Sequence, residues 1–256
     1  MSARPVPDEP VLELRGVAKN FGPIEVLADI DVTLAAGERR ALIGPNGAGK
    51  STLFNLVSGR FPPSKGTIRL AGTRIDGRPA HRLNRMGLSR SFQITQVFPG
   101  LPVHDNVYVA VMSRHGKRWP LVRVGPVWRR ITDETRALIA QAGLAPLADR
   151  PAGTLAYSEQ RALEICMTVA TGPKLILLDE PTAGMSRAEA AATVAFIARM
   201  TEGRTLLMVE HDMDVVFGLA DSISVLTHGR ILATGTPTQI RDDPRVQAAY
   251  LGEGAH

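Results

Sequence analysis

Near the N-terminus, nine consecutive residues combine glycines with one lysine and two hydroxyl side chains: Gly44, Pro45, Asn46, Gly47, Ala48, Gly49, Lys50, Ser51 and Thr52. Their spacing fits G-x-x-x-x-G-K-[ST], which is typical of loops that bind nucleotide phosphates. The glycines can adopt positive φ and bring backbone N–H groups close to an anion. Lys50 adds a cation for the β- and γ-phosphates, and Ser51 has a hydroxyl that can ligate Mg²⁺. We therefore expect this segment to bind a nucleotide.

A second group of reactive side chains follows two apolar runs. Asp179 and Glu180 come directly after residues 175–178, and His211 ends the run that begins at residue 205. Such runs are typical of parallel strands buried on both faces, whose carboxyl ends meet at the ligand-binding edge of a sheet. There Asp179 can hold Mg²⁺, Glu180 can polarise the water that attacks a γ-phosphate, and His211 can contact that phosphate. This arrangement indicates hydrolysis more than transfer to a second substrate.

The elements around these residues alternate between strands and helices. We expect the glycine-rich loop to join a strand at 40–43 to a helix that begins at residue 52. Alternating apolar and polar residues predict short, antiparallel strands upstream, and periodic apolar residues predict helices downstream. The strands are expected over 11–17, 30–34 and 66–70, and the helices over 132–142, 158–170, 187–200 and 215–219.

Composition limits the other possibilities. The 256 residues are enough for one α/β domain with an inserted subdomain, and no uninterrupted apolar run approaches the length of a membrane span. A net charge of +5 is too small to predict nucleic-acid binding. The single cysteine, Cys166, lies in an apolar helical run and is expected in the core. Residues 1–10 are polar and proline-rich, carry no signal peptide, and are expected to be a disordered tail.

Residues 107–131 contain no acidic residue and are interrupted by prolines and a glycine. We expect an inserted surface segment here rather than core. Two interpretations stay open: a solvated basic loop, or a loop that touches anionic lipid headgroups or a membrane partner. The basic residues are Arg114, Lys117, Arg118, Arg123, Arg129 and Arg130.

The order of these motifs resembles that of the ATP-binding subunits of ABC transporters, over residues 11–251. The resemblance implies an ATPase domain over 11–256, with a helical subdomain inserted at about 94–170. The implied fold is α/β: a P-loop nucleotide-binding fold with a mixed central sheet and an antiparallel β part at the N-terminus. The resemblance further implies that Phe21 stacks on adenine and that Gln93 contacts both nucleotide and Mg²⁺. It assigns catalytic roles to Glu180, His211 and Lys50. It assigns metal-binding roles to Ser51, Gln93 and Asp179.

The chain departs from this family at the signature sequence, where members usually have Leu-Ser-Gly-Gly-Gln. The corresponding residues are Leu155, Ala156, Tyr157, Ser158 and Glu159. Ala156 lacks a hydroxyl for the γ-phosphate, and Ser158 replaces a glycine that allows close backbone approach. In the family this segment contacts ATP held by the other subunit, so we expect the site formed with the partner's P-loop to be weakened. An asymmetric heterodimer with a second ATP-binding subunit is therefore favoured, with a homodimer as the alternative.

Several details are similar to the ATPases of branched-chain amino acid importers: residues 91–93, 97–101, 210–213 and 249–252, and Tyr157. This resemblance implies ATP hydrolysis at the cytoplasmic face of the inner membrane, powering uptake of branched-chain or other hydrophobic amino acids, or amides. The implied cofactors are ATP and Mg²⁺. The implied partners are a second ATPase, two permease subunits and, indirectly, a periplasmic substrate-binding protein, with no nucleic acid.

The sequence leaves three alternatives to an amino acid importer. The first is an importer of another compound, such as urea, an organic acid or a lipid. The chain can also be an ABC ATPase that works without a membrane partner. A P-loop kinase or GTPase is the third possibility, although the guanine-reading Asn-Lys-x-Asp sequence is absent.

Overall fold

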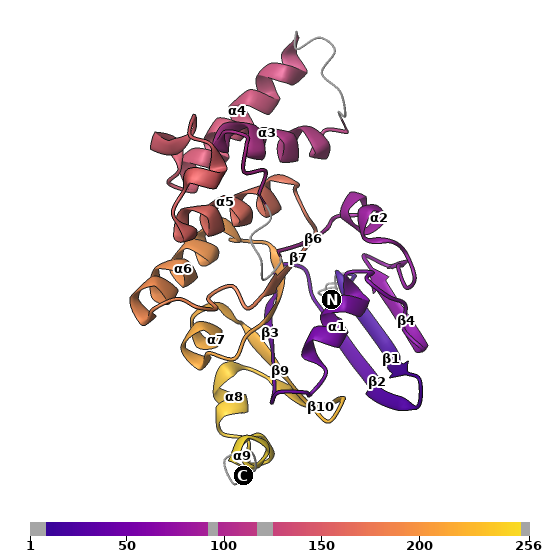
Figure 1. Cartoon of the computed structure of the whole chain (residues 1–256). Helices are drawn as coiled ribbons and strands as arrows, with labels where there is room; N and C mark the ends of the chain where they lie inside the picture. The colour runs from indigo at the N-terminus through magenta and orange to yellow at the C-terminus, as the bar shows by residue number, and fades with distance from the viewer. Residues whose placement is uncertain (1–8, 92–96, 117–124, 252–256) are drawn as a thin grey trace, which may run out of the picture.

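The computed structural model describes residues 9–91, 97–116 and 125–251 (Figure 1). Gln93 lies outside the described residues, as do Lys117, Arg118 and Arg123 of the basic segment and most of the expected tail, residues 1–8. The roles proposed for them stay predictions.

Strands in the described part of the chain form two sheets. The larger is parallel except for one edge strand, with the spatial order β10 (Arg230–Gly235), β9 (Ser222–Thr227), β3 (Arg39–Ile43), β8 (Thr205–Val209), β7 (Leu175–Asp179) and β6 (Leu88–Arg90). The smaller is antiparallel, with the order β2 (Ile24–Leu34), β1 (Leu12–Phe21), β4 (Lys65–Leu70) and β5 (Thr73–Arg74). The predicted α/β fold, with a mixed central sheet and an antiparallel N-terminal part, is confirmed.

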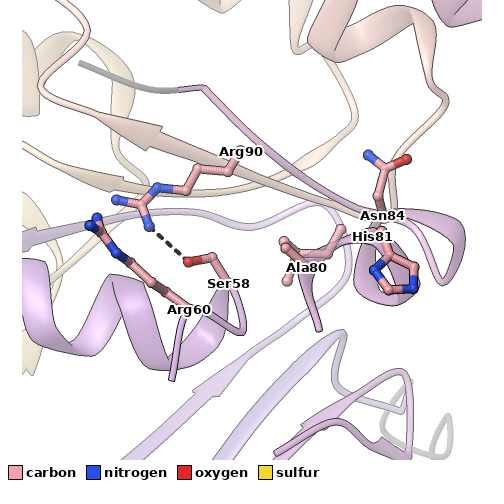
Figure 2. Close-up of a pocket in the computed structure, with 7 residues that line it drawn as sticks. Ser58, Arg60, Ala80, His81, Asn84 and Arg90 are labelled. Atoms are coloured by element: carbon pink, nitrogen blue, oxygen red, sulfur yellow. Dashed lines mark hydrogen bonds between the residues drawn. The ribbon is translucent and has the colours of Figure 1, made fainter. Parts of the chain in front are cut away.

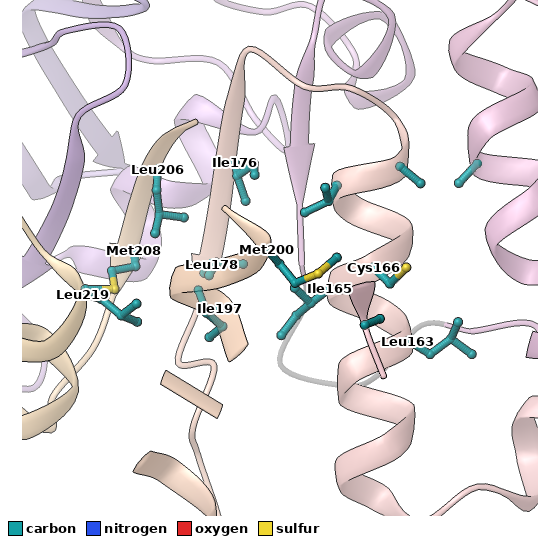
Figure 3. Close-up of a cluster of buried hydrophobic side chains, with 14 of the residues drawn as sticks. Leu163, Ile165, Cys166, Ile176, Leu178, Ile197, Met200, Leu206, Met208 and Leu219 are labelled. Carbon is teal, nitrogen blue, oxygen red and sulfur yellow. The ribbon is translucent and has the colours of Figure 1, made fainter. Parts of the chain in front are cut away.

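The central strands are buried on both faces, as their continuous apolar runs predict. In β7, Ile176 and Leu178 join a core cluster that includes the helices, shown in part in Figure 3. Leu175 and Leu177 point the other way and join a second cluster between the two sheets. This alternation is the two-residue period of a strand, and it holds β7 rigidly between two cores.

The described helices are α1 (Lys50–Val57), α2 (Ala80–Arg85), α3 (Val103–Arg114), α4 (Pro126–Gln141), α5 (Tyr157–Ala170), α6 (Arg187–Met200), α7 (Met213–Leu219), α8 (Pro237–Arg241) and α9 (Pro244–Leu251). Helices α1, α5, α6 and α7 begin within two residues of the predicted positions, whereas α4 begins six residues before its predicted start and α2 and α3 are not predicted. Side chains near the start of α6 fix where this helix begins. Ser186 Oγ accepts from the Glu189 backbone N–H, and Glu189 Oε2 accepts from the Ser186 N–H at 2.9 Å. No helix in the described ranges is long and apolar enough to cross a bilayer.

Two differences from the sequence-based expectation have local causes. Strands β1 and β2 run further towards their connecting turn than alternation predicts, because irregularities between Leu14 and Asn20 interrupt the pattern. Strand β6 is not predicted at all, since three residues are too few to show a period. It matters for the site because Arg90 is its last residue.

Between β6 and β7, helices α3, α4 and α5 pack together as an inserted helical part (Figure 1). The expectation that 107–131 is surface rather than core is wrong for the described ends of that segment. Val107, Val111 and Ile131 are fully buried in the helical core. The reason is that α3 places apolar residues four apart on one face, while its basic residue Arg114 stays exposed. The basic composition of the segment hid a helix that is largely buried.

Cys166 on α5 lies in the same core and is confirmed as a core residue (Figure 3). Burial raises the pKa of its thiol to about 12. Its sulfur lies 3.6 Å from the backbone carbonyl of Leu138 on α4. The thiol is therefore protonated at neutral pH and serves as packing between α4 and α5.

Two valines on α3 test the buried role of this segment. Val111→Ala removes two fully buried methyl groups and is expected to lower the free energy of unfolding by about 2 kcal/mol. Val109, two residues away and 37% exposed, is the matched control, and Val109→Ala should change stability by less than about 0.5 kcal/mol. Denaturant unfolding of both variants makes the comparison. Equal losses would mean that α3 does not bury this face in solution.

Candidate nucleotide-binding site

The glycine-rich loop joins β3 to α1, as the sequence predicts. Its three glycines all have positive φ: 148° at Gly44, 77° at Gly47 and 104° at Gly49. Gly49 is the residue that precedes α1. Glycine has no side chain to cap this helix, and the start of an α-helix is a position where backbone N–H groups can bind an anion.

The loop is also held from outside by the end of β9 and by the turn that follows it. A Cβ atom on Gly44 would lie 2.0 Å from the carbonyl oxygen of Leu226, so only glycine fits there. The Gly229 N–H donates to the carbonyl of Ala48 at 3.2 Å. These contacts come from far along the chain and shape the loop in the absence of any ligand.

Lys50 lies over the mouth of this loop. Its ammonium group donates to the carbonyl oxygens of Gly44 at 2.5 Å and Pro45 at 2.8 Å. The side chain of Ser51 is exposed at the start of α1. A lysine charge and a hydroxyl therefore lie beside the backbone N–H groups of the loop, which is a suitable environment for a polyphosphate.

The acidic residues lie at the carboxyl edge of the same sheet. Asp179, at the end of β7, pairs with Val209 of β8, and Val209 pairs with Leu42 of β3 on its other side. The loop after β3 and the residues after β7 therefore lie on either side of β8. The sequence-based expectation that Asp179, Glu180 and His211 share one edge is confirmed by this register.

Glu180 has an unusual backbone, with φ of +44°. A left-handed conformation at a residue with a side chain costs on the order of 1–3 kcal/mol, and such residues cluster at functional sites. Two hydrogen bonds hold it: the Glu180 N–H donates to Val209 O at 3.0 Å, and the Ala183 N–H donates to Glu180 O at 3.1 Å. The chain reverses at this residue instead of continuing the strand.

Glu210 is a functional candidate that the sequence does not single out. Its side chain is fully buried, and its carboxylate accepts from the Thr182 hydroxyl at 2.7 Å and from the His211 N–H at 3.0 Å. It thus joins the segment after Glu180 to the segment that holds His211, whose own side chain is 67% exposed. In the sequence, Glu210 is marked only as a carboxylate that follows an apolar run. That position does not distinguish a residue that holds two segments together from one that binds a metal or a nucleotide.

Arg90 is the second residue that sequence reasoning missed. Its guanidinium donates to Asp179 Oδ2 at 2.7 Å from the end of β6. In the sequence, Arg90 is only a basic residue three positions before Gln93. Its role becomes visible once β6 is seen to lie beside β7.

Phe21 ends β1 and is 46% exposed. Its ring meets Phe61 edge-on with centroids 5.4 Å apart, and the ammonium of Lys19 lies 5.0 Å from its centroid. An exposed, partly fixed ring can stack on a base. Its role towards adenine stays a prediction, as does the role of Gln93.

The signature residues lie at the start of α5, in the helical part and away from α1 (Figure 1). Ala156, Tyr157 and Ser158 are exposed. The Glu159 carboxylate accepts from the Ala156 N–H at 2.8 Å and so occupies one of the backbone donors at the helix start. An exposed segment away from its own P-loop suits contact with another subunit.

These residues fit a nucleotide with its Mg²⁺. Only glycine allows this path of the loop, because a Cβ atom would meet the backbone of Leu226 at Gly44 and would lie 2.7 Å from the Leu27 side chain at Gly49. Mg²⁺ in nucleotide sites needs few protein ligands, since phosphates and waters supply the rest. Ser51 and Asp179 are the oxygen donors that would hold it, and no group of three or more metal-binding side chains occurs among the described residues.

Comparisons with known proteins agree with this geometry. The family described as "ABC transporter" matches residues 27–183, and the family described as "Branched-chain amino acid ATP-binding cassette transporter" matches residues 230–256. The chain is 39% identical to the high-affinity branched-chain amino acid transport ATP-binding protein BraF of Pseudomonas aeruginosa, over 95% of this chain and 98% of that protein. It is 38% identical to LivG of Escherichia coli K12, which has the same description, over 96% and 99%.

Solved structures show the same fold. The ADP conformation of MJ1267, described as an ATP-binding cassette of an ABC transporter, superposes with a TM-score of 0.80 at 26% identity, covering 95% of this chain and 99% of that one. A preformed phosphate loop, an acidic edge beside it and these matches lead to one conclusion. The chain belongs to the ABC transporter family of ATP-binding subunits, in the branched-chain amino acid group.

Proposed function

We propose that this chain hydrolyses ATP to power uptake of branched-chain or other hydrophobic amino acids, or amides, through partner permeases. The observation that carries the proposal is the common sheet edge of the phosphate loop, Asp179 and Glu180. The similarity to BraF and LivG supports the choice of cargo, because both are named for branched-chain amino acid transport. A different cargo, such as urea, an organic acid or a lipid, is the alternative.

The chemistry assigned to the chain's own residues follows from their places. The loop N–H groups and Lys50 bind the phosphates, and Ser51 with Asp179 would hold Mg²⁺, which neutralises phosphate charge when bound. Glu180 orients and polarises the attacking water from the reversed backbone after β7. His211, exposed at the same edge, contacts the γ-phosphate.

We infer that the chain acts with a second ATP-binding subunit. Each ATP then lies between one subunit's P-loop and the other's signature, so closure depends on the γ-phosphate. Three features weaken the signature offered by this chain: Ala156 has no hydroxyl, Ser158 has a Cβ, and Glu159 adds a negative charge that already occupies the Ala156 N–H. Unequal sites are better suited to a heterodimer than to a homodimer.

The proposed location is the cytoplasmic face of the inner membrane, as a peripheral subunit. Two permeases would bind the chain there, with a periplasmic binding protein in contact with them. Purification of the tagged chain from gently solubilised membranes tests this proposal. Two multi-span proteins and a second ATPase are expected to copurify. Purification without any membrane protein would leave the ATPase chemistry intact and contradict the transport role.

Substitutions at Glu180 separate its chemistry from its backbone strain. Glu180→Gln is expected to lower ATP turnover of the assembled complex by at least about 100-fold and to accumulate an ATP-bound dimer, because the base is lost. Glu180→Gly should lose turnover to the same extent. Its free energy of unfolding should exceed that of Glu180→Gln by about 1 kcal/mol, because glycine accepts positive φ. Turnover assays and thermal unfolding measure the two effects. Normal turnover in Glu180→Gln would remove Glu180 from the base role.

Changing the signature towards the usual sequence, with Tyr157 kept, tests the unequal-site proposal. The triple substitution Ala156→Ser, Ser158→Gly and Glu159→Gln is expected to raise ATP hydrolysis by the assembled pair severalfold. Glu202→Gln, at an exposed residue, makes the same change in charge and serves as the control. An unchanged rate in the triple variant would argue that the signature of this chain is not limiting.

A further inference from the structure

Arg90 connects the helix after the phosphate loop to the strand that ends in Asp179. One guanidinium nitrogen donates to Asp179 Oδ2 at 2.7 Å. The other donates to Asn55 Oδ1 at 2.8 Å and to Ser58 Oγ at 2.7 Å, both on the C-terminal side of α1. Figure 2 shows the hydrogen bond from Arg90 to Ser58 and the approach of Arg90 from β6. The side chains of Arg90 and Asp179 are only 11% and 9% exposed.

The guanidinium is held in place independently of Asp179. Asn55 and Ser58 fix one side of its planar fork, and its central carbon lies 5.7 Å from the centroid of the Phe54 ring. A lysine carries its three donors on one nitrogen, whereas the two terminal nitrogens of the planar guanidinium contact Asn55 and Ser58 on one side and Asp179 on the other. Arg90 therefore presents a fixed positive charge to the carboxylate of Asp179.

The position of that charge matters because of what the carboxylate faces. Asp179 lies at the edge where the nucleotide phosphates are expected, and charges interact strongly at a site with little exposure to water. Without a cation beside it, the carboxylate would repel the phosphates. Mg²⁺ removes this repulsion when it binds, so the effect of Arg90 should be largest when Mg²⁺ is absent.

We propose that Arg90 is a positioning residue that serves as the resident counter-ion of Asp179 before Mg²⁺ and nucleotide bind. It keeps the carboxylate oriented towards the metal position and offsets its charge in the metal-free state. This inference rests on the proposed nucleotide chemistry, and it adds a residue to which the sequence motifs assign no role.

The test compares nucleotide binding with and without the metal, using a fluorescent ATP analogue and the full chain. In EDTA, Arg90→Gln should weaken binding about tenfold, because the charge of Asp179 is no longer offset. In excess Mg²⁺ the loss should stay below about threefold. Arg60→Gln is the matched control, since Arg60 is exposed, lines the same pocket as Arg90 (Figure 2) and carries the same charge. It should change binding less than twofold in both conditions.

A double variant distinguishes charge compensation from scaffolding. Arg90→Gln combined with Asp179→Asn leaves no carboxylate to offset, so its affinity in EDTA should return to within about threefold of the original protein. This pair contains no unpaired buried charge, so it remains a test even where Arg90→Gln alone does not fold. Thermal unfolding checks that each variant is folded.

Three results would overturn the inference: equal losses with and without Mg²⁺ in Arg90→Gln, no loss in EDTA, or a double variant that binds as weakly as Arg90→Gln. Failure of the unmodified chain to bind the analogue even with Mg²⁺ would instead contradict the proposed nucleotide function. The two failures are therefore distinguishable.

Discussion

The site depends on the close approach of two backbones, at the loop before α1 and the turn after β9. Gly44 has no room for a Cβ atom because the carbonyl of Leu226 lies where that atom would be. Gly229 completes the contact by donating to Ala48. The sheet order explains how residues so distant in sequence meet, since β9 lies directly beside β3. Phosphate binding is thus prepared by tertiary packing, and the loop need not be ordered by its ligand.

The same packing sets the acidic edge. Strands β3, β8 and β7 are each buried on both faces, so none of them can slip in register without exposing a whole row of apolar side chains. The register places Asp179 opposite Val209, and the chain reverses at Glu180 one residue later. Rigidity there is useful because a base must hold a water within hydrogen-bond reach of its target. Strain at Glu180 can persist because both cores hold the strand that precedes it.

Much of the sheet and of the phosphate loop could be predicted from the sequence, because both depend on the spacing of residues along the chain. Continuous apolar runs identified the central strands, and the glycine spacing identified the loop and its positive φ values. What could not be predicted depends on neighbours in space. Strand β6 is too short to show a period, so Arg90 could not be placed beside Asp179. The buried face of α3 was missed because composition over 107–131 outweighed the four-residue spacing of Val107 and Val111.

Two of the missed residues share a physical feature: each is a charged group, largely buried, that contacts a motif without belonging to it. Arg90 fixes the carboxylate of Asp179, and Glu210 accepts from Thr182 and His211 across two loops. Buried charges are costly unless each is paired or fully hydrogen-bonded, so such groups contribute little net stability compared with apolar packing. Their contribution is orientation. A motif specifies which atoms do the chemistry, whereas these buried partners specify where those atoms are held when the nucleotide arrives.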